Sequence, residues 1–176
     1  GGAGLHRGGN GLSVAYRFLV DGHIGIHDDR WLTYPWGVNG GKPGMRSTKL
    51  LVRTDGTEEY IPAKCEGVKV NKGDLLYFNT WGGGGWGDPL KRDPDVVVSD
   101  VLKKLVSVEG ARRYGVVIND DLSLNEKETE ALRAEMLKDT VADEMFNFGG
   151  TIEEIKLKSL EETHLEAPAS PTFLNQ

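Results

Sequence analysis

The chain has 176 residues and a formal net charge of −6, which argues against a nucleic-acid-binding protein because such proteins present basic surfaces to phosphates. This length suffices for one domain with a core, or for a piece of a larger domain. No apolar run approaches the ~20 residues of a membrane-spanning helix, and no signal-peptide pattern opens the chain. The lone cysteine, Cys65, excludes an intramolecular disulfide and fits a reducing cytoplasm.

The charge is unevenly distributed. Residues 119–166 carry fourteen acidic and five basic side chains, whereas the rest of the chain carries thirteen acidic and sixteen basic ones. We interpret the acidic segment as a solvated helical face, and we expect chemistry or subunit contacts in the remainder. The chain begins Gly1-Gly2-Ala3-Gly4 without an initiating Met, so we expect a fragment, a cleaved chain or a separate piece of a longer protein.

Strands are expected in the first half, where 20 of the 24 glycines lie within residues 1–87. Short apolar runs there alternate with turn signals. Asp21-Gly22 and Asp55-Gly56 are hairpin signals for the first and second pairs of strands, and Lys72-Gly73-Asp74 is a turn between the third pair. The expected strands are 12–20, 23–27, 49–53, 59–61, 68–70 and 75–79.

Helices are expected after Asp88. Asp93-Pro94 is typical of an N-cap followed by proline at the first helical position. Ser107 and Gly115 would bound a short second helix. Ser123 and Glu126, three residues apart, fit a capping box that opens a helix of about twenty residues. Further expectations are a short strand at 116–118, a charged helix at 151–163 and an extended arm from Pro168.

These elements predict an α+β fold, with a Gly-rich, mainly antiparallel β region followed by C-terminal helices. We expect residues 1–118 to form the β-rich glycine-loop region, with short helices after residue 93. Residues 119–167 would form an acidic helical segment, and residues 168–176 an extended tail.

Three segments place charged or aromatic residues among glycines, which let a backbone approach a ligand and expose N–H groups to an anion. None matches the phosphate-binding pattern G-x-x-x-x-G-K-[ST], and none completes G-x-G-x-x-G between a strand and a helix. The structural alternative is a set of tight loops between strands, with tryptophans packed over them. The segments are 4–11, 27–44 and 81–94, and the tryptophans are Trp36, Trp81 and Trp86.

Few residues suit a metal ion or a nucleophile. His23 and His27 share one face of an expected strand but lie about 13 Å apart along it. Asp28 and its neighbour Asp29 would point to opposite sides, so the residues indicate no metal ligand. Asp28, Asp29 and Asp88 are acid/base candidates only if the fold brings them into one cleft. The chain has no G-x-S-x-G nucleophile motif.

An ordered series of motifs resembles one family. It comprises G-x-H-R-G-G-x-G at 4–11, Pro35-Trp36-Gly37 with the glycine run at 40–44, GGGGWGDPLKRD at 82–93, and Ala111 to Val117. The series is similar to the C-terminal part of the hydantoinase B family, relatives of 5-oxoprolinase, caprolactamase and the alpha subunits of acetone-type carboxylases. The resemblance covers about residues 1–137 and leaves 138–176 unmatched.

The resemblance implies part of the B-type subunit of an ATP-dependent amidohydrolase. Such an enzyme opens a cyclic amide (hydantoin, 5-oxoproline or a lactam) after an A-type ATPase subunit phosphorylates it. Two alternatives stay open: a subunit of an ATP-dependent ketone carboxylase, and a non-catalytic assembly subunit. The whole assembly would use ATP and a divalent metal ion (Zn, Mn or Fe), and we expect this chain alone to bind neither and to be inactive.

The resemblance also suggests where a site would lie. The family's metal ligands are expected in an N-terminal part that this chain lacks, so none is assigned here. The chain would supply a wall of the site and contacts to the A-type subunit and to the rest of the B-type subunit. Candidate catalytic residues are His6, Arg7 and Asp88, and candidate substrate-binding residues are Gly8, Gly9, Gly84 and Gly85.

Overall fold

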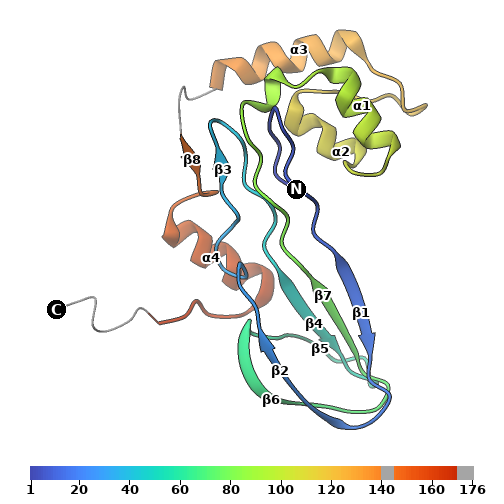
Figure 1. Ribbon diagram of the computed structural model, residues 1–176, viewed down its shortest axis with the longest axis vertical. Coiled ribbons are helices and arrows are strands. Elements are labelled where there is room, and N and C mark those ends of the chain that lie inside the picture. Colours follow the sequence, from blue (N-terminus) through green and yellow to red (C-terminus); the bar gives the residue numbers. More distant parts are fainter. Residues whose placement is uncertain (140–144, 170–176) are drawn as a thin grey trace, which may run out of the picture. The chain divides into compact units, whose positions relative to one another are not determined.

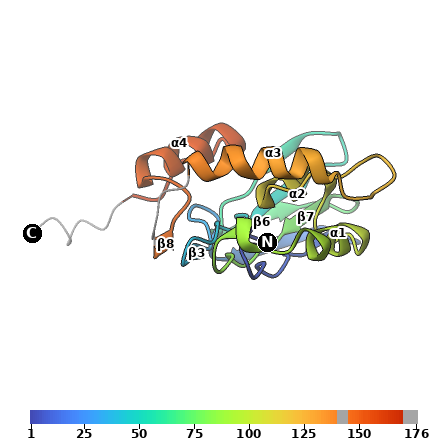
Figure 2. The ribbon, with the colours of Figure 1, turned by 90° about the horizontal axis from the view of Figure 1, so that it is seen from above.

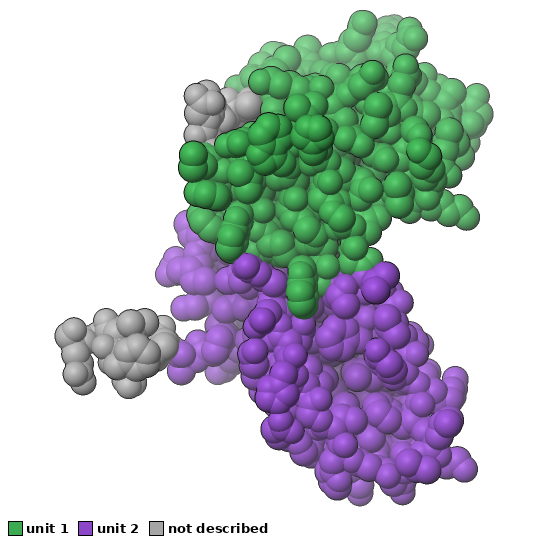
Figure 3. Space-filling view, in the orientation of Figure 1, with its two compact units in different colours: residues 1–11, 34–45, 81–149 green, residues 12–33, 46–80, 150–176 purple. Residues whose placement is uncertain are grey.

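A computed structural model of the protein describes residues 1–139 and 145–169. The chain forms two compact units, each assembled from three separate stretches of sequence (Figure 3). None of the helices in the described ranges is long and apolar enough to cross a membrane. Unit 1 comprises Gly1–Gly11, Tyr34–Met45 and Trp81–Gly149, and unit 2 comprises Leu12–Thr33, Arg46–Thr80 and Gly150–Gln176.

Unit 2 is built on two antiparallel sheets around one core. The larger sheet has the order β1-β7-β4-β5, and the smaller pairs β2 with β6 (Figure 1). Apolar residues from both sheets meet in a common cluster of Ile26, Leu51, Ile61, Val70 and Leu76. The strands are β1 (Ser13–Arg17), β2 (Gly22–His27), β4 (Thr48–Val52), β5 (Glu58–Tyr60), β6 (Lys64–Val70) and β7 (Leu75–Asn79).

The pairing of these strands corrects one prediction and confirms another. The hairpin expected around Asp21-Gly22 is wrong, because β1 pairs with β7 and β2 pairs with β6. This arrangement places the β2 side chain of Ile26 in the second sheet, where it is buried against Leu51 of the first. The hairpin around Asp55-Gly56 is confirmed by the pairing of β4 with β5. Strands β6 and β7 are also confirmed, although they join different sheets.

Helices α1 and α2 of unit 1 begin at the predicted caps. The side chain of Asp93 accepts the N–H of Asp95 at the start of α1 (Pro94–Leu102). Ser107 caps α2 (Val108–Ala111), which continues as a 3-10 turn and ends at Gly115 with a φ of 64°. Their buried side chains form the core of this unit, which comprises Ala3, Val97, Val101, Val106, Ala111, Tyr114, Val116 and Ile118.

The helix α3 begins two residues later than predicted. Asn125, not Ser123, accepts the N–H of Glu128 at the start of α3 (Glu126–Met136). Ser123 instead donates its hydroxyl to Asp121, because an Asx-type turn places the two side chains together. The predicted strand at 116–118 is reduced to one isolated bridge between Ile118 and Leu124. After α3 a 3-10 turn, Leu137–Asp139, follows, and the rest of the predicted helix lies outside the described residues.

The remaining elements lie beyond residue 144. Helix α4 (Ile152–Thr163) confirms the predicted charged helix, and Thr151 with Glu154 forms its capping box. The short strand β8 (Phe146–Asn147) pairs with β3 (Gly37–Val38), a contact that the sequence did not suggest. Figures 1 and 2 show these two strands side by side. The α+β class is confirmed, whereas most of the predicted tail at 168–176 lies outside the described residues.

Candidate functional site

The three glycine-rich segments come together in unit 1 as extended chains packed backbone to backbone. The N–H of Gly2 donates to the carbonyl of Gly83 at 2.8 Å, which joins the first segment to the third. The N–H of Lys42 donates to Ala3 at 2.7 Å, and that of Gly85 donates to Lys42 at 2.9 Å. Each segment is therefore hydrogen-bonded to both others, and we call this assembly of 1–11, 35–45 and 81–88 the glycine bundle.

Glycine is required in the bundle because its chains are closer than a side chain allows. A β-carbon on Gly8 would lie 2.1 Å from the carbonyl oxygen of Gly83, and one on Gly41 would lie 2.1 Å from that of Gly85. These separations are far below van der Waals contact. The glycines thus serve packing between remote segments, rather than the tight loops between strands that the sequence suggested as the structural alternative.

The four candidate substrate-binding glycines differ in their surroundings. Gly8 and Gly85 are buried and donate their N–H groups to the carbonyls of Gly2 and Lys42, at 3.0 and 2.9 Å. These two donors are therefore used by the bundle and cannot bind an anion while the bundle is intact. Gly9 is exposed with open space around its α-carbon, and Gly84 is half-buried. Their assignment to substrate binding stays a prediction.

His6 lies at the surface of the bundle beside Trp86. The two residues exchange a pair of backbone hydrogen bonds of 2.9 Å, and their ring centroids are 5.5 Å apart. Trp86 is 47% exposed and lies next to the imidazole of His6. The sequence did not single out Trp86 as a site residue. The signal in the sequence that could have identified Trp86 is an aromatic side chain inside a run of glycines.

Arg7 is engaged in a network inside unit 1. Its Nη1 donates to the carbonyl of Gly8 at 2.8 Å and to Oδ1 of Asn10 at 2.9 Å. Its Nε lies 3.7 Å from the carboxylate of Asp100, which also accepts Nη2 of Arg92 at 2.7 Å. Two guanidinium groups share one carboxylate, so Arg7 ties the glycine bundle to helix α1.

Asp88 has a local structural contact. Its Oδ1 accepts the N–H of Leu90 at 2.8 Å and caps the 3-10 turn Pro89–Lys91. No hydrogen bond or ion pair within the described part of the chain joins Asp88 to His6 or Arg7. The structure places the three candidates in one unit, but it does not show them meeting at one point.

The candidate acid/base and metal residues of unit 2 are engaged elsewhere. Nε2 of His27 lies 2.5 Å from the carboxylate of Glu66 at an exposed position. Asp28 is buried, whereas Asp29 is exposed and pairs with Lys64 at 3.1 Å. The acidic pair therefore diverges, as alternation along an extended chain requires. No group of three or more His, Cys, Asp or Glu side chains in residues 1–139 and 145–169 could hold a metal ion, so these residues do not fit a metal centre.

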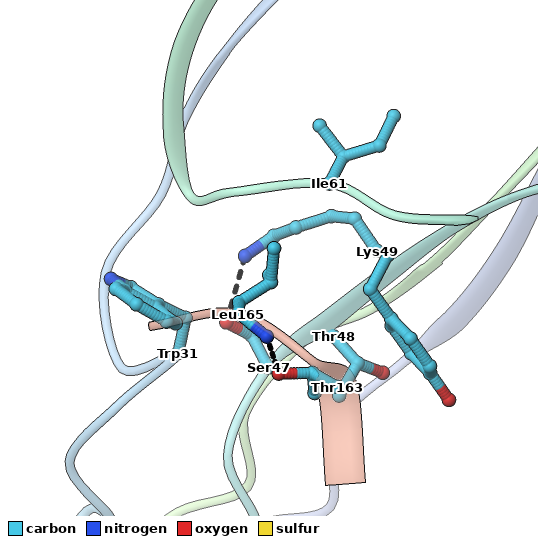
Figure 4. A pocket seen from close by; sticks show the side chains of 8 residues that line it. Trp31, Ser47, Thr48, Lys49, Ile61, Thr163 and Leu165 are labelled. Atoms are coloured by element: carbon cyan, nitrogen blue, oxygen red, sulfur yellow. Dashed lines mark hydrogen bonds between the residues drawn. The ribbon is translucent and has the colours of Figure 1, made fainter. Parts of the chain in front are cut away.

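A buried polar network in unit 2 involves residues that the sequence did not single out. The side chain of Lys49 is 1% exposed, and its ammonium pairs with Asp28 and donates to Oγ of Ser47 at 3.0 Å. Ser47 donates to Asp28 at 2.5 Å. The network lies beside a small pocket, seen from close by in Figure 4, which is lined by Trp31, Ser47, Thr48, Lys49, Tyr60, Ile61, Thr163 and Leu165.

The sequence model of the Hydantoinase B/oxoprolinase family matches residues 1–89, which is half of the chain. The chain belongs to this family, and the resemblance carried by its glycine motifs is confirmed. The matched residues include all three segments of the glycine bundle. They also include the network of Asp28, Ser47 and Lys49, but not helix α4.

Individual relatives are much longer than this chain. It is 33% identical to the B-type component of a putative D-/L-hydantoinase from Pseudomonas sp. strain NS671, over 74% of this chain and 22% of that protein. It is 36% identical to the beta component of the caprolactamase of Pseudomonas jessenii, over 76% of this chain and 24% of that protein. The chain thus spans about a quarter of the length of these relatives.

Solved structures give the same picture of the fold. The crystal structure of the ATP-dependent caprolactamase from Pseudomonas jessenii matches with a TM-score of 0.61 and 32% identity, over 75% of this chain and 24% of that one. The nucleotide-free structure of acetone carboxylase matches with a TM-score of 0.53 over 92% of this chain and 26% of that one. At 23% identity, the second likeness concerns the fold alone.

Proposed function

We propose that this chain is part of the B-type component of an ATP-dependent amidohydrolase that opens a cyclic amide such as a hydantoin, 5-oxoproline or a lactam. The observation that supports this most directly is the likeness to an ATP-dependent caprolactamase in both sequence and structure, with 32% identity at a TM-score of 0.61. An A-type component phosphorylates the substrate, and the phosphorylated amide is then hydrolysed in the B-type component. The chain is inactive alone because it spans about a quarter of its relatives.

Within that assembly the glycine bundle forms a rigid wall of the substrate site. Its backbone is held by hydrogen bonds between all three segments, so the side chains that leave it are positioned precisely enough to orient a ligand. His6 and Trp86 are two such side chains, and they lie together at the surface. The flat indole suits stacking on a planar amide ring, and the imidazole can donate or accept a hydrogen bond. Arg7 and Asp88 position this wall through their contacts to Asp100 and Leu90.

ATP and a divalent metal ion are bound by other parts of the assembly. The histidine and aspartate side chains that could have contributed ligands here are paired with protein groups, His27 with Glu66 and Asp28 with Lys49. The partners of the chain are accordingly the rest of the B-type component and an A-type ATPase component.

The test is turnover by the complete assembly, made with ATP and a panel of hydantoins, 5-oxoproline and lactams. We expect ring-opened product to form only with ATP and with both components present. Product formed instead from a ketone and bicarbonate would identify a carboxylase. An assembly that forms but turns over none of these substrates would indicate a non-catalytic assembly role and would overturn the proposal.

Variants of the same assembly test the residues. We expect His6→Ala and Trp86→Ala to lower kcat/KM, whereas Tyr16→Ala, a change at an exposed aromatic residue (53%) of unit 2 outside the glycine bundle, leaves it unchanged. Asp88→Ala should lower turnover together with the stability of unit 1, because it removes a cap. Unchanged turnover in both His6→Ala and Asp88→Ala would remove the site assignment.

A further inference from the structure

Strand β1 forms one edge of the larger sheet of unit 2. It pairs with β7 on one side, and none of the described strands lies on its other side (Figure 1). The N–H of Thr80 donates to the carbonyl of Leu12 at 2.8 Å, and the N–H of Phe18 donates to the carbonyl of Asp74 at 3.0 Å. Backbone groups alternate in direction along an antiparallel strand, so those of residues 12, 14, 16 and 18 face β7. The outward-facing N–H and C=O groups are those of Ser13, Ala15 and Arg17.

The other strand edges of unit 2 carry features that discourage pairing, whereas the edge of β1 does not. Strand β5, at the far side of the same sheet, has three residues, of which Glu58 and Glu59 are exposed. In the smaller sheet, β2 has a bulge in its pairing and β6 presents Lys64 and Lys69 to solvent. Short length, charges and bulges are the usual ways of protecting an edge. Strand β1 pairs without a bulge over five residues, and its one charge is Arg17 at the end.

Apolar side chains next to this edge are exposed. Leu12 is 68% exposed, Leu19 is 73% exposed and Val20 is 72% exposed. Leu12 and Phe18 are separated by an even number of residues and lie on the same face of the sheet, and Phe18 packs against the core of unit 2. The face that bears the core therefore continues to the β1 edge, where Leu12 is left uncovered. Exposed apolar surface beside an open strand edge is typical of a site that a further segment covers.

The rest of the B-type component fits this edge better than a second copy of the chain. The chain spans 22% and 24% of its two relatives, so most of a B-type component lies outside it. Strand β1 lies within the residues that the family model matches. Antiparallel pairing of two β1 strands about a two-fold axis would place the Leu12 side chains of both copies on one face. A second copy would thus enlarge the uncovered apolar face, whereas a longer polypeptide can both pair with the edge and cover that face.

We propose that the outer edge of β1 pairs with an extended segment of the rest of the B-type component, which adds a strand to the larger sheet. The outward N–H and C=O groups of Ser13, Ala15 and Arg17 supply the main-chain hydrogen bonds, as in other cases of strand addition. The contact is made by backbone groups, so a side-chain change such as Tyr16→Ala leaves it in place. This inference rests on one part of the proposed function, namely that the chain belongs to a larger B-type component, and not on the reaction.

The first experiment compares amide hydrogen exchange, residue by residue, in the free 176-residue chain and in the complete assembly. We expect the outward amides of Ser13, Ala15 and Arg17 to exchange at least about tenfold more slowly in the assembly. The matched control is the outward edge of β5, since Ile61 donates its N–H to Lys49 and the amides of Glu58 and Tyr60 therefore face away from β4. Those two amides should exchange at the same rate in both samples.

The second experiment removes one outward donor. Ala15→Pro deletes an N–H that β7 does not use, a position at which an edge strand tolerates proline. We expect it to weaken association of the chain with the rest of the B-type component at least about tenfold. Ala15→Val, which keeps the N–H, and Glu58→Pro, which removes an outward N–H from the other edge, should associate as the unchanged chain does. The exchange comparison stands by itself if Ala15→Pro does not fold.

The outcomes separate this inference from the reaction. Fast exchange of all three β1 amides in an assembly that turns over a cyclic amide would overturn the strand addition alone. Slow exchange in an assembly without turnover would support the strand addition while the proposed reaction falls. Protection of β1 in the free chain that rises with its concentration would show pairing with a second copy and overturn the proposal. So would equal association of the folded Ala15→Pro and Ala15→Val variants, or a chain that joins no larger component.

Discussion

A β-carbon on Gly84 would lie 1.8 Å from the carbonyl oxygen of Trp36. No rotamer can relieve this contact, because the backbone fixes the position of the β-carbon and the carbonyl oxygen belongs to the backbone of a packed segment. We therefore expect Gly84→Ala to lower the free energy of unfolding by about 3 kcal/mol, as other overpacked positions do. Gly9→Ala, in the same bundle with nothing within 4 Å, is the control and should cost less than ~0.5 kcal/mol. Urea unfolding followed by tryptophan fluorescence measures both, and equal losses would contradict the packing role of Gly84.

The lysines that pair with the neighbouring residues Asp28 and Asp29 should contribute differently to the free energy of unfolding. Lys49→Met leaves the buried carboxylate of Asp28 without its cation, and we expect a loss of about 3–5 kcal/mol in unfolding free energy. Lys64→Met removes the partner of Asp29, but both of those side chains are more than 60% exposed, so the loss should stay below ~1 kcal/mol. Denaturant titration of the two variants under one set of conditions compares them. A Lys49→Met variant as stable as Lys64→Met would show that Asp28 finds other compensation.

Asp74 should make the stability of unit 2 depend on pH in the acidic range. It is fully buried, and the N–H groups of Asn71 and Thr54 and the guanidinium of Arg53 hold its pKa below the usual value. A lowered folded-state pKa means that the stabilisation is present above the unfolded pKa of about 3.9 and is lost as pH falls below it.

We therefore expect the unfolding free energy to decline as pH falls below about 4, and Asp74→Asn to flatten that decline while lowering stability at neutral pH. Denaturant unfolding at a series of pH values measures both effects. Asp29→Asn, at an exposed position, is the comparison and should leave the acid decline in place. An unchanged slope in Asp74→Asn would mean that other carboxyl groups cause it.

The start of α3 distinguishes two possible caps. The structure assigns the cap to Asn125, whose side chain accepts the N–H of Glu128 at 3.1 Å. Asn125→Ala should therefore cost about 1 kcal/mol, and Ser123→Ala about half of that or less. Thermal unfolding by circular dichroism compares the two, and the reverse order would support the capping box that the sequence suggested.

Much of the local structure could be predicted because its causes lie within a few residues. The caps at Asp93 and Ser107 and the left-handed stop at Gly115 depend on one side chain and the next turn of backbone. The hairpin of β4 and β5 depends on the turn that joins them, because this turn holds the two strands next to each other. The family could be predicted from the order of several motifs, and the family model matches half of the chain.

The surroundings of the candidate site residues could be predicted only in part. His6, Arg7 and Asp88 lie in one unit, and their role in a site stays a prediction. The contacts of Arg7 to Asp100 and of Asp88 to Leu90 are properties of the folded chain. Trp86 becomes a candidate only in the folded chain, where its ring lies beside that of His6. Ser47 and Lys49 fit no motif. A lysine side chain is usually exposed to solvent, whereas that of Lys49 is 1% exposed.

The sequence by itself determined most of the element types, the caps at Asp93 and Ser107 and the glycine-rich composition of three segments, since each is set by local bonding or by the absence of a side chain. Only the tertiary structure decided how the strands other than β4 and β5 pair, that the glycines serve a bundle of remote chains, and that Lys49 and Arg46 are buried with carboxylates. The physical reason is that hydrophobic burial and ion pairing act between segments distant in the chain. A turn signal such as Asp21-Gly22 reverses the chain but does not choose the partner of β1, whereas the shared core of the two sheets does.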